Sequence, residues 1–323
     1  MHALVTPAQA GGQPLDPRLR KGDKPCLPRQ HIYLPFESGT YRMAMALTTV
    51  PESAWFEFDE RYADEMAEKQ VLLRERHQDV FAALPESDAA RLETLHEIIA
   101  NLTAYAPHWF ARNGETVVNA LTGETWDLAA PSCDPLELAG RLVQEDLCII
   151  QHGESGPIFT AATLCFPSRW RLHEKIGKPL AAVHGPVPHY AEKLAAPVDR
   201  FMARVKPGHI ASRLNWSVLD SPAMFQPGGK WRQQTDSAIT SDNAGERLYL
   251  RVERQTLRRL PQSGAILFGI RVHSYQMARA ITARADAVRL AEAVCALPDA
   301  TVHYKSLKVY GAALLGWLDE RSR

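Results

Sequence analysis

The chain has 323 residues, and its 37 basic and 37 acidic side chains leave no formal net charge. This balance argues against a dedicated nucleic-acid or anionic-membrane binder, which would normally carry a basic excess. No apolar run approaches the roughly 18 residues of a membrane span, and residues 311–318 are among the longest such runs. The first residues lack the charged start and apolar stretch of a secretory signal, so a cytoplasmic protein is expected.

The cysteines exclude several classes of site. The chain has 5 of them, scattered without any C-x-x-C pair. An odd count without paired spacing argues against a disulfide framework, a zinc knuckle or an iron–sulfur cluster held by this chain alone.

The N-terminal part divides into an arm and a helical block. Residues 1–35 are rich in proline, glycine and charge and predict a flexible arm. Residues 36–135 predict a helical block, in which one amphipathic helix begins at Ser53 and a second has Ser87 as its N-cap. A hairpin with its turn near residues 122–123 follows.

Residues 136–280 predict one compact unit: two strand-like runs, a helical middle and three further strands, the last two joined by the tight PQSG turn. Because tight turns connect antiparallel neighbours, the pattern favours an α+β fold with a five-stranded antiparallel sheet and helices on one side. Five strands with helices between the second and third form the outline of a PAS domain, a fold that can hold haem. For residues 281–323 we expect C-terminal helices that pack on the same globule. The connection 222–247 is long and polar, which is typical of either a lid over a site or a mobile surface loop.

Several segments carry a family resemblance in their order along the chain. They are TYRMAMAL (residues 40–47), DERYADE (59–65), QEDLCII (144–150), CFPSRW (165–170), EKIGKPLAAVHGPVPHY (174–190), RLNW (213–216) and RVERQTLRRLP (251–261). Together they resemble the successive signatures of the haem-carrying alpha subunit of the haem-dependent oxidative N-demethylases, which are dimethylamine monooxygenase-like proteins. The likeness extends over nearly the whole chain after the first thirty residues.

The resemblance implies a PAS-like domain with haem b that oxidises a small secondary amine with O2 and releases formaldehyde. It also implies electrons from NADPH, delivered by a partner subunit that carries flavin and an iron–sulfur cluster. The sequence agrees with electron delivery by a partner subunit. It has neither a G-x-G-x-x-G motif after a strand, which would bind a dinucleotide, nor a cysteine cluster, which would hold an iron–sulfur cluster. The alternatives are a haem-PAS sensor without turnover and an inactive relative that keeps only the fold.

His184 is the expected axial ligand of the haem iron. It follows the apolar LAAV, and the prolines after it exclude a regular helix, while Gly185 permits close approach by a flat cofactor. His189 is the alternative ligand, and a buried histidine bonded to a backbone carbonyl is the structural alternative for His184. A rival non-haem iron site would use His184, His189 and Glu192, but their spacing matches neither H-E-x-x-H nor its inverse.

The strands that follow supply the other candidates. Haem propionates require cationic partners, and the candidates are Lys175, Arg213, Arg251 and Arg271. A small amine is a cation near neutral pH and requires a carboxylate or an aromatic face, and the candidates are Trp216, Tyr249 and Glu253. For each of these residues a strand-surface ion pair or a core aromatic is the alternative.

Two further interpretations concern the same strands. Gly269, in the middle of the last strand, suggests a place where a ligand lies against the backbone. Glu145 and Asp146 are expected to form a structural ion pair with one of the arginines.

Overall fold

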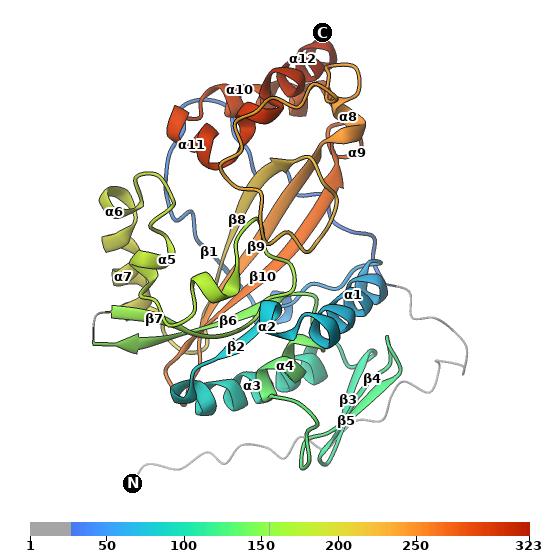
Figure 1. Cartoon of the computed structure of the whole chain (residues 1–323). Helices are drawn as coiled ribbons and strands as arrows, with labels where there is room; N and C mark the ends of the chain where they lie inside the picture. The colour runs from blue at the N-terminus through green and yellow to red at the C-terminus, as the bar shows by residue number, and fades with distance from the viewer. Residues whose placement is uncertain (1–26, 155) are drawn as a thin grey trace.

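The structure is a computed structural model, and it describes residues 27–154 and 156–323 (Figure 1). Most of the predicted arm, residues 1–35, therefore lies outside the described residues. Its last part, residues 27–35, packs against the sheet, where the carbonyl of His31 accepts a hydrogen bond from Tyr275 Oη at 2.5 Å. The packed part of the chain thus begins before residue 36.

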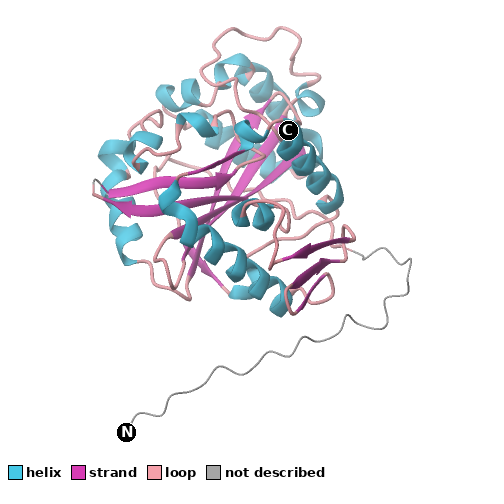
Figure 2. Cartoon of the chain, turned by 60° about the horizontal axis from the view of Figure 1, so that its bottom comes forward, coloured by secondary structure: helices cyan, strands magenta, loops and turns pink. Residues whose placement is uncertain are grey.

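The described residues form an antiparallel sheet of seven strands in the order β1-β8-β9-β10-β6-β7-β2, and a separate antiparallel sheet in the order β3-β4-β5 (Figures 1 and 2). The strands are β1 (Thr48–Val50), β2 (Phe81–Ala83), β3 (Phe110–Asn113), β4 (Thr116–Asn119), β5 (Glu124–Asp127), β6 (Asp146–Gly153), β7 (Gly156–Thr163), β8 (Ile210–Leu219), β9 (Tyr249–Arg259) and β10 (Ile266–Gln276).

The α+β class and the antiparallel sheet are confirmed, but the predicted number of five strands is wrong. The five predicted strands are β6 to β10, and β1 and β2 extend the sheet at its two edges. Each edge strand has only three residues. That is too short for a period-two alternation of apolar and polar side chains to be recognised.

Helices surround the large sheet (Figure 2). They are α1 (Tyr62–Glu75), α2 (His77–Val80), α3 (Asp88–Tyr105), α4 (Pro135–Gly140), α5 (Leu180–Val183), α6 (Tyr190–Lys193), α7 (Ala195–Arg204), α8 (Ala244–Arg247), α9 (Met277–Ala280), α10 (Arg284–Cys295), α11 (Asp299–Tyr304) and α12 (Gly311–Ser322), with single 3-10 turns η1 (Glu52–Ala54), η2 (Pro85–Ser87), η3 (Leu172–Glu174) and η4 (Leu307–Val309). None of the described helices is long and apolar enough to cross a membrane.

The first predicted helix starts later than its amphipathic pattern suggested. The chain makes only the turn η1 near Ser53, and α1 begins at Tyr62. The carbonyls of Ala54 and Trp55 accept hydrogen bonds from Arg254 on β9, so a tertiary contact occupies acceptors that a helix would use. Ser87 does lie at the N-cap position of α3, but its hydroxyl donates to the carbonyl of Leu84 at 2.6 Å and does not cap the helix.

The pleat of the sheet separates two environments. On β10, Arg271 and His273 point to the face covered by the N-terminal segment and α1, whereas the alternate residues Phe268 and Ile270 line a cavity on the other face. The pleat thus places Arg271 on the face away from the cavity.

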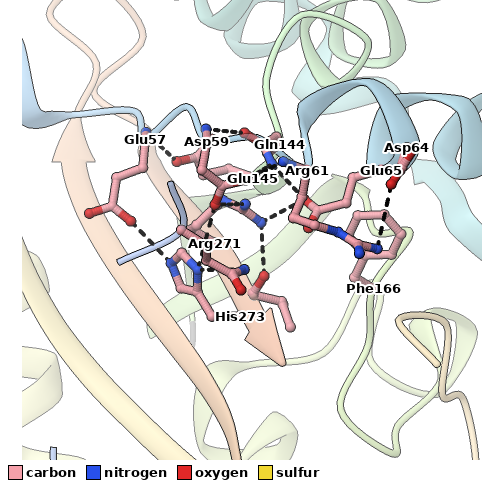
Figure 3. A network of polar contacts seen from close by, with 12 residues as sticks. Glu57, Asp59, Arg61, Asp64, Glu65, Gln144, Glu145, Phe166, Arg271 and His273 are labelled. Carbon is pink, nitrogen blue, oxygen red and sulfur yellow. Dashed lines mark hydrogen bonds and ion pairs between the residues drawn. The ribbon is translucent and has the colours of Figure 1, made fainter. Parts of the chain in front are cut away.

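Arg271 is the centre of a buried polar network that fastens the N-terminal block to the sheet (Figure 3). Its side chain is fully buried, and its two terminal nitrogens contact Asp59 Oδ2 and Glu65 Oε2, each at 2.7 Å. Gln144 Nε2 donates to the same Glu65 oxygen at 2.7 Å. The paired carboxylates compensate the cost of burying the guanidinium, and this network holds α1 in register with β10.

The expected ion pair of Glu145 or Asp146 with an arginine is replaced by a lysine contact. Lys69 Nζ on α1 lies 3.8 Å from Asp146 Oδ1 and donates to the backbone carbonyl of Val143 at 3.0 Å. Asp146 also accepts the backbone N–H groups of Cys165 and Phe166 at 2.8 and 2.7 Å. This carboxylate therefore joins α1 to the segment that follows β7.

Replacing Arg271 by methionine should destabilise the protein strongly, because Asp59 and Glu65 would remain buried without their cation. We expect a loss of about 3–5 kcal/mol in the free energy of unfolding, measured by urea denaturation. Arg74→Met is the matched control, since the Arg74 side chain is 66% exposed. Equal stability of the two variants would contradict a central role for the network.

Candidate functional site

A cavity of about 870 Å³ opens on the sheet face opposite to Arg271. Its floor is formed by the central strands β6, β8, β9 and β10, and one side by the segment that contains α5, α6 and α7. Apolar side chains such as Ile150, Phe159, Leu257 and Phe268 make up much of its wall. The size and the mostly apolar lining are those of a small-molecule or cofactor site.

His184 lines this cavity as the residue that ends α5. Its Nδ1 lies 2.9 Å from the carbonyl oxygen of Leu180, one turn earlier. A carbonyl can only accept, so Nδ1 carries the proton and Nε2 keeps a free lone pair. Burial lowers the pKa of the imidazole to about 4, so that the ring is neutral at neutral pH. Tyr190 stacks on it with ring centroids 4.5 Å apart and an interplanar angle of 9°, which fixes its orientation.

The other histidine candidates lie elsewhere. His189 is exposed, has a left-handed backbone at φ 61° and is not among the described residues that line the large cavity. Within the described residues no three His, Cys, Asp or Glu side chains gather closely enough to hold a metal ion, so His184, His189 and Glu192 do not form the rival non-haem iron site.

Glu253 on β9 supplies a buried carboxylate to the cavity floor. Its Oε2 accepts hydrogen bonds from Asn215 Nδ2 at 3.2 Å and Gln255 Nε2 at 2.7 Å. Burial alone would raise its pKa, but hydrogen bonds from Ser168 and Asn215, with the charge of Arg251, more than offset this effect and lower it. An ionised carboxylate thus faces the cavity at neutral pH.

Arg213 and Trp216 on β8 also line the cavity. Because Asn215 pairs with Glu253 and Trp216 pairs with Val252, the Trp216 side chain lies on the opposite face of the sheet from this carboxylate. Arg213 Nε is buried and has no hydrogen-bond partner among the described residues, and burial lowers the pKa of the guanidinium. A buried donor without an acceptor is costly. An anionic group placed in the cavity would satisfy it.

Lys175 approaches from the other side of the cavity. Its ammonium donates to the carbonyl of Val183 at 2.6 Å and lies 5.2 Å from the ring centroid of Trp170. The first contact joins the lysine to the residue just before His184. Lys175 therefore both lines the cavity and braces the loop that presents the imidazole.

Three other candidates, Tyr249, Arg251 and Arg271, are not among the described residues that line the cavity. The guanidinium of Arg251 donates to the hydroxyl of Ser168 and to backbone carbonyls, including those of Phe166 and Met224, at 2.9 Å. Arg271 lies on the other face because of the pleat, and Tyr249 lies at the end of its strand, paired with Leu219. Arg251 and Arg271 therefore hold loops and helices against the sheet.

Gly269 also has a structural explanation. It belongs to the face of β10 away from the cavity, where a Cβ would lie 2.7 Å from Thr256 Oγ1 on β9. The glycine thus permits a close contact between neighbouring strands, and the expectation of a ligand against the backbone is wrong.

Sequence reasoning missed three contributions to the cavity. The irregular segment 35–47 forms one wall, and Lys230 and Lys305 line the cavity from a long connection and from the C-terminal part. None of them belongs to a periodic pattern. The sequence offered one signal, the unusual length of connection 222–247, and of that connection only Lys230 is among the lining residues.

A polar clasp around Glu57 holds residues 30–33, just before the segment 35–47, in place; Figure 3 shows the contact between Glu57 and His273 at its centre. Tyr33 Oη donates to Glu57 Oε1, and His273 Nε2 donates to Glu57 Oε2 at 3.1 Å. Gln30 Nε2 donates to the other nitrogen of His273 at 3.3 Å. Arg254 Nε forms an ion pair with Glu57, at 3.1 Å from Glu57 Oε1. Thus one carboxylate ties the N-terminal segment to two strands of the sheet.

The Glu57 carboxyl of the clasp makes the free energy of unfolding depend on pH. Burial by itself would raise the pKa of Glu57, but the hydrogen bond from His273 and the charge of Arg254 lower it from 4.5 to about 2. A depressed carboxyl pKa contributes stability above the unfolded value, and this contribution is lost as the pH falls through the folded value. Glu57→Gln should therefore lose about 3 kcal/mol at pH 7, and the difference from wild type should shrink between pH 4.5 and 2 in urea titrations.

The matched control is Glu60→Gln, because Glu60 is exposed and is the next glutamate along the chain. Its stability should follow that of wild type at every pH. A Glu57→Gln deficit that stays constant down to the lowest pH would contradict an ionised clasp.

Comparison with protein families agrees with the geometry of the cavity. The model of the family described as "Haem-dependent oxidative N-demethylase, alpha subunit-like" (HODM_asu-like) matches residues 46–315. The match includes the sheet, His184, Glu253 and the lysines of the cavity, and it extends over most of the chain. The protein therefore belongs to the haem-dependent oxidative N-demethylase alpha subunit-like family.

Proposed function

We propose that the chain is the haem-binding oxygenase subunit of an oxidative N-demethylase acting on a small secondary amine such as dimethylamine. The observation that carries the proposal is His184, a neutral imidazole whose Nδ1–H donates to the carbonyl of Leu180 and whose Nε2 has no hydrogen-bond partner among the described residues. Such a hydrogen bond fixes the tautomer of a metal-binding histidine and raises its basicity. Haem b is the cofactor that we propose for the cavity.

The other residues of the cavity fit this group. Apolar side chains from β6, β9 and β10 provide a slot for a flat macrocycle, and the unpartnered Nε of Arg213 suits one of its carboxylates. His184 would hold the iron. His189 is exposed and lies outside the lining, so it is the weaker alternative.

We propose that the central strands form a PAS-like core. The support is that α5, α6 and α7 lie between the second and third of the five strands β6 to β10. The segment with His184 then faces the sheet from the side on which the cavity lies.

Bound haem would supply the activation of O2 and the oxidation of the N-methyl group. With dimethylamine, the balanced reaction consumes O2, NADPH and a proton, and yields methylamine, formaldehyde, NADP⁺ and water. The residues of this chain bind and orient the amine. Glu253 offers an ionised carboxylate to the ammonium form, and Asn215 and Gln255 hold that carboxylate in place. Trp216 lies on the other face of β8 and is not assigned to this amine site.

The electrons require a partner. The sequence has no dinucleotide-binding glycine motif and no cysteine cluster, and the description of the family as alpha subunit-like indicates further subunits. We propose a reductase subunit that carries flavin and an iron–sulfur cluster and takes electrons from NADPH. Tyr249, Arg251 and Arg271 are assigned structural roles in this proposal.

Haem binding should depend on His184 and not on His189. Purified wild type and His189→Ala should show the Soret band of bound haem, whereas His184→Ala should lose it because the axial nitrogen is missing. Added imidazole should restore a Soret band to His184→Ala, which tests that the variant is folded. Loss of the band in His189→Ala with retention in His184→Ala would overturn the assignment.

Turnover should depend on Glu253. With a chemical or protein reductant and O2, the haem-loaded protein should release formaldehyde from dimethylamine, and Glu253→Gln should raise KM at least about tenfold because the ammonium loses its counter-charge. Glu174→Gln, whose side chain is 53% exposed, is the matched control. Bound, reducible haem without formaldehyde from a panel of secondary and tertiary amines would instead favour a sensor.

A further inference from the structure

Three lysines approach the same cavity from separate segments of the chain. Lys175 follows η3, Lys230 belongs to the long connection after β8, and Lys305 follows α11. They lie close enough to influence one another, since the positive charge of Lys230 acts on both Lys175 and Lys305. Three cations from remote parts of the sequence are thus gathered at one cavity.

None of the three ammonium groups has a carboxylate within 4.0 Å among the described residues. Each makes one hydrogen bond to a neutral acceptor and lies over one aromatic ring instead. Lys175 donates to the carbonyl of Val183 at 2.6 Å, Lys230 to Tyr304 Oη at 3.1 Å, and Lys305 to the carbonyl of Trp216. An ammonium group has three N–H donors, so every one of these lysines retains donors for a further acceptor.

This arrangement is unfavourable for the chain by itself. Burial lowers the pKa of both Lys175 and Lys305 to about 8. The charge of Lys230 adds to this effect at both lysines, although at Lys305 it is preceded by the opposite effect of Glu253. Buried charges without partners cost stability, and apolar residues of similar size would pack at no such cost. Glu253, the carboxylate on the cavity floor, is already held by two amides. An anionic molecule bound in the cavity would supply counter-charges to these lysines.

We propose that Lys175, Lys230 and Lys305 together bind the two carboxylates of the cofactor, in addition to Arg213. This inference rests on the proposed haem function and assigns it two residues, Lys230 and Lys305, that no sequence pattern indicated. The inference also gives a role to the long connection between β8 and α8, residues 220–243. The cofactor would contact this connection through Lys230 and the C-terminal part of the chain through Lys305. Arg232 N already donates to Ser306 Oγ at 3.2 Å, which aligns these two segments.

The test compares haem with haem dimethyl ester, in which both carboxylates are capped. Wild type should bind haem at least about a hundredfold more tightly than the ester, since roughly tenfold is expected for each lost charge-assisted hydrogen bond. The triple variant Lys175→Met, Lys230→Met, Lys305→Met should bind haem at least about tenfold more weakly than wild type, because only Arg213 remains to pair with a carboxylate. The ester itself should bind the variant and wild type alike. Affinities come from Soret titrations and from the rate of haem transfer to apomyoglobin.

The matched control replaces the exposed Lys193, Lys206 and Lys308 by methionine and should leave both affinities unchanged. The haem-free triple cavity variant should unfold at the same or a higher urea concentration than haem-free wild type, because it loses unpaired buried charges. A purely structural role would instead lower that concentration.

Two results would overturn the inference while leaving the proposed function intact: equal affinity of wild type for haem and its ester, or undiminished haem affinity in the triple cavity variant. Absence of any His184-dependent Soret band in wild type would instead reject the proposed function. The two failures are therefore distinguishable.

Discussion

The fold depends on a fully buried guanidinium, that of Arg271, at the centre of the large sheet. Asp59 and Glu65 compensate its charge from the N-terminal block, so that block must pack against one face of β10. The pleat then leaves the alternate residues of β10 for the opposite face, where they line the cavity. One buried ion network thus decides which side of the sheet is closed by helices and which side can hold a ligand.

The cavity divides its charges in a way that suits an anionic cofactor and a cationic substrate. A single carboxylate, Glu253, is kept ionised by amide and hydroxyl donors, while the lysines and Arg213 lack carboxylate partners within the described residues. His184 is kept neutral by burial, as a metal-binding nitrogen requires. The chain just before the segment 35–47, which closes one wall, is fastened through Glu57.

Much of the central fold could be predicted, because β6 to β10 carry long apolar or alternating runs. The edge strands β1 and β2 could not, since three residues give no periodic signal and their pairing depends on distant partners. The helix expected from Ser53 was displaced to Tyr62 because Arg254 takes the carbonyls of the intervening turn. In both cases a long-range contact outweighed a local preference.

The sequence by itself determined the antiparallel central strands, since their apolar and alternating runs depend on neighbours within a few residues. Only the tertiary structure decided which arginines reach the cavity. Arg251 and Arg271 resemble Arg213 in sequence, yet their guanidinium groups are taken up by backbone carbonyls and by buried carboxylates. The sequence likewise did not predict that Lys175, Lys230 and Lys305 line the same cavity. These residues are far apart along the chain and share no sequence pattern.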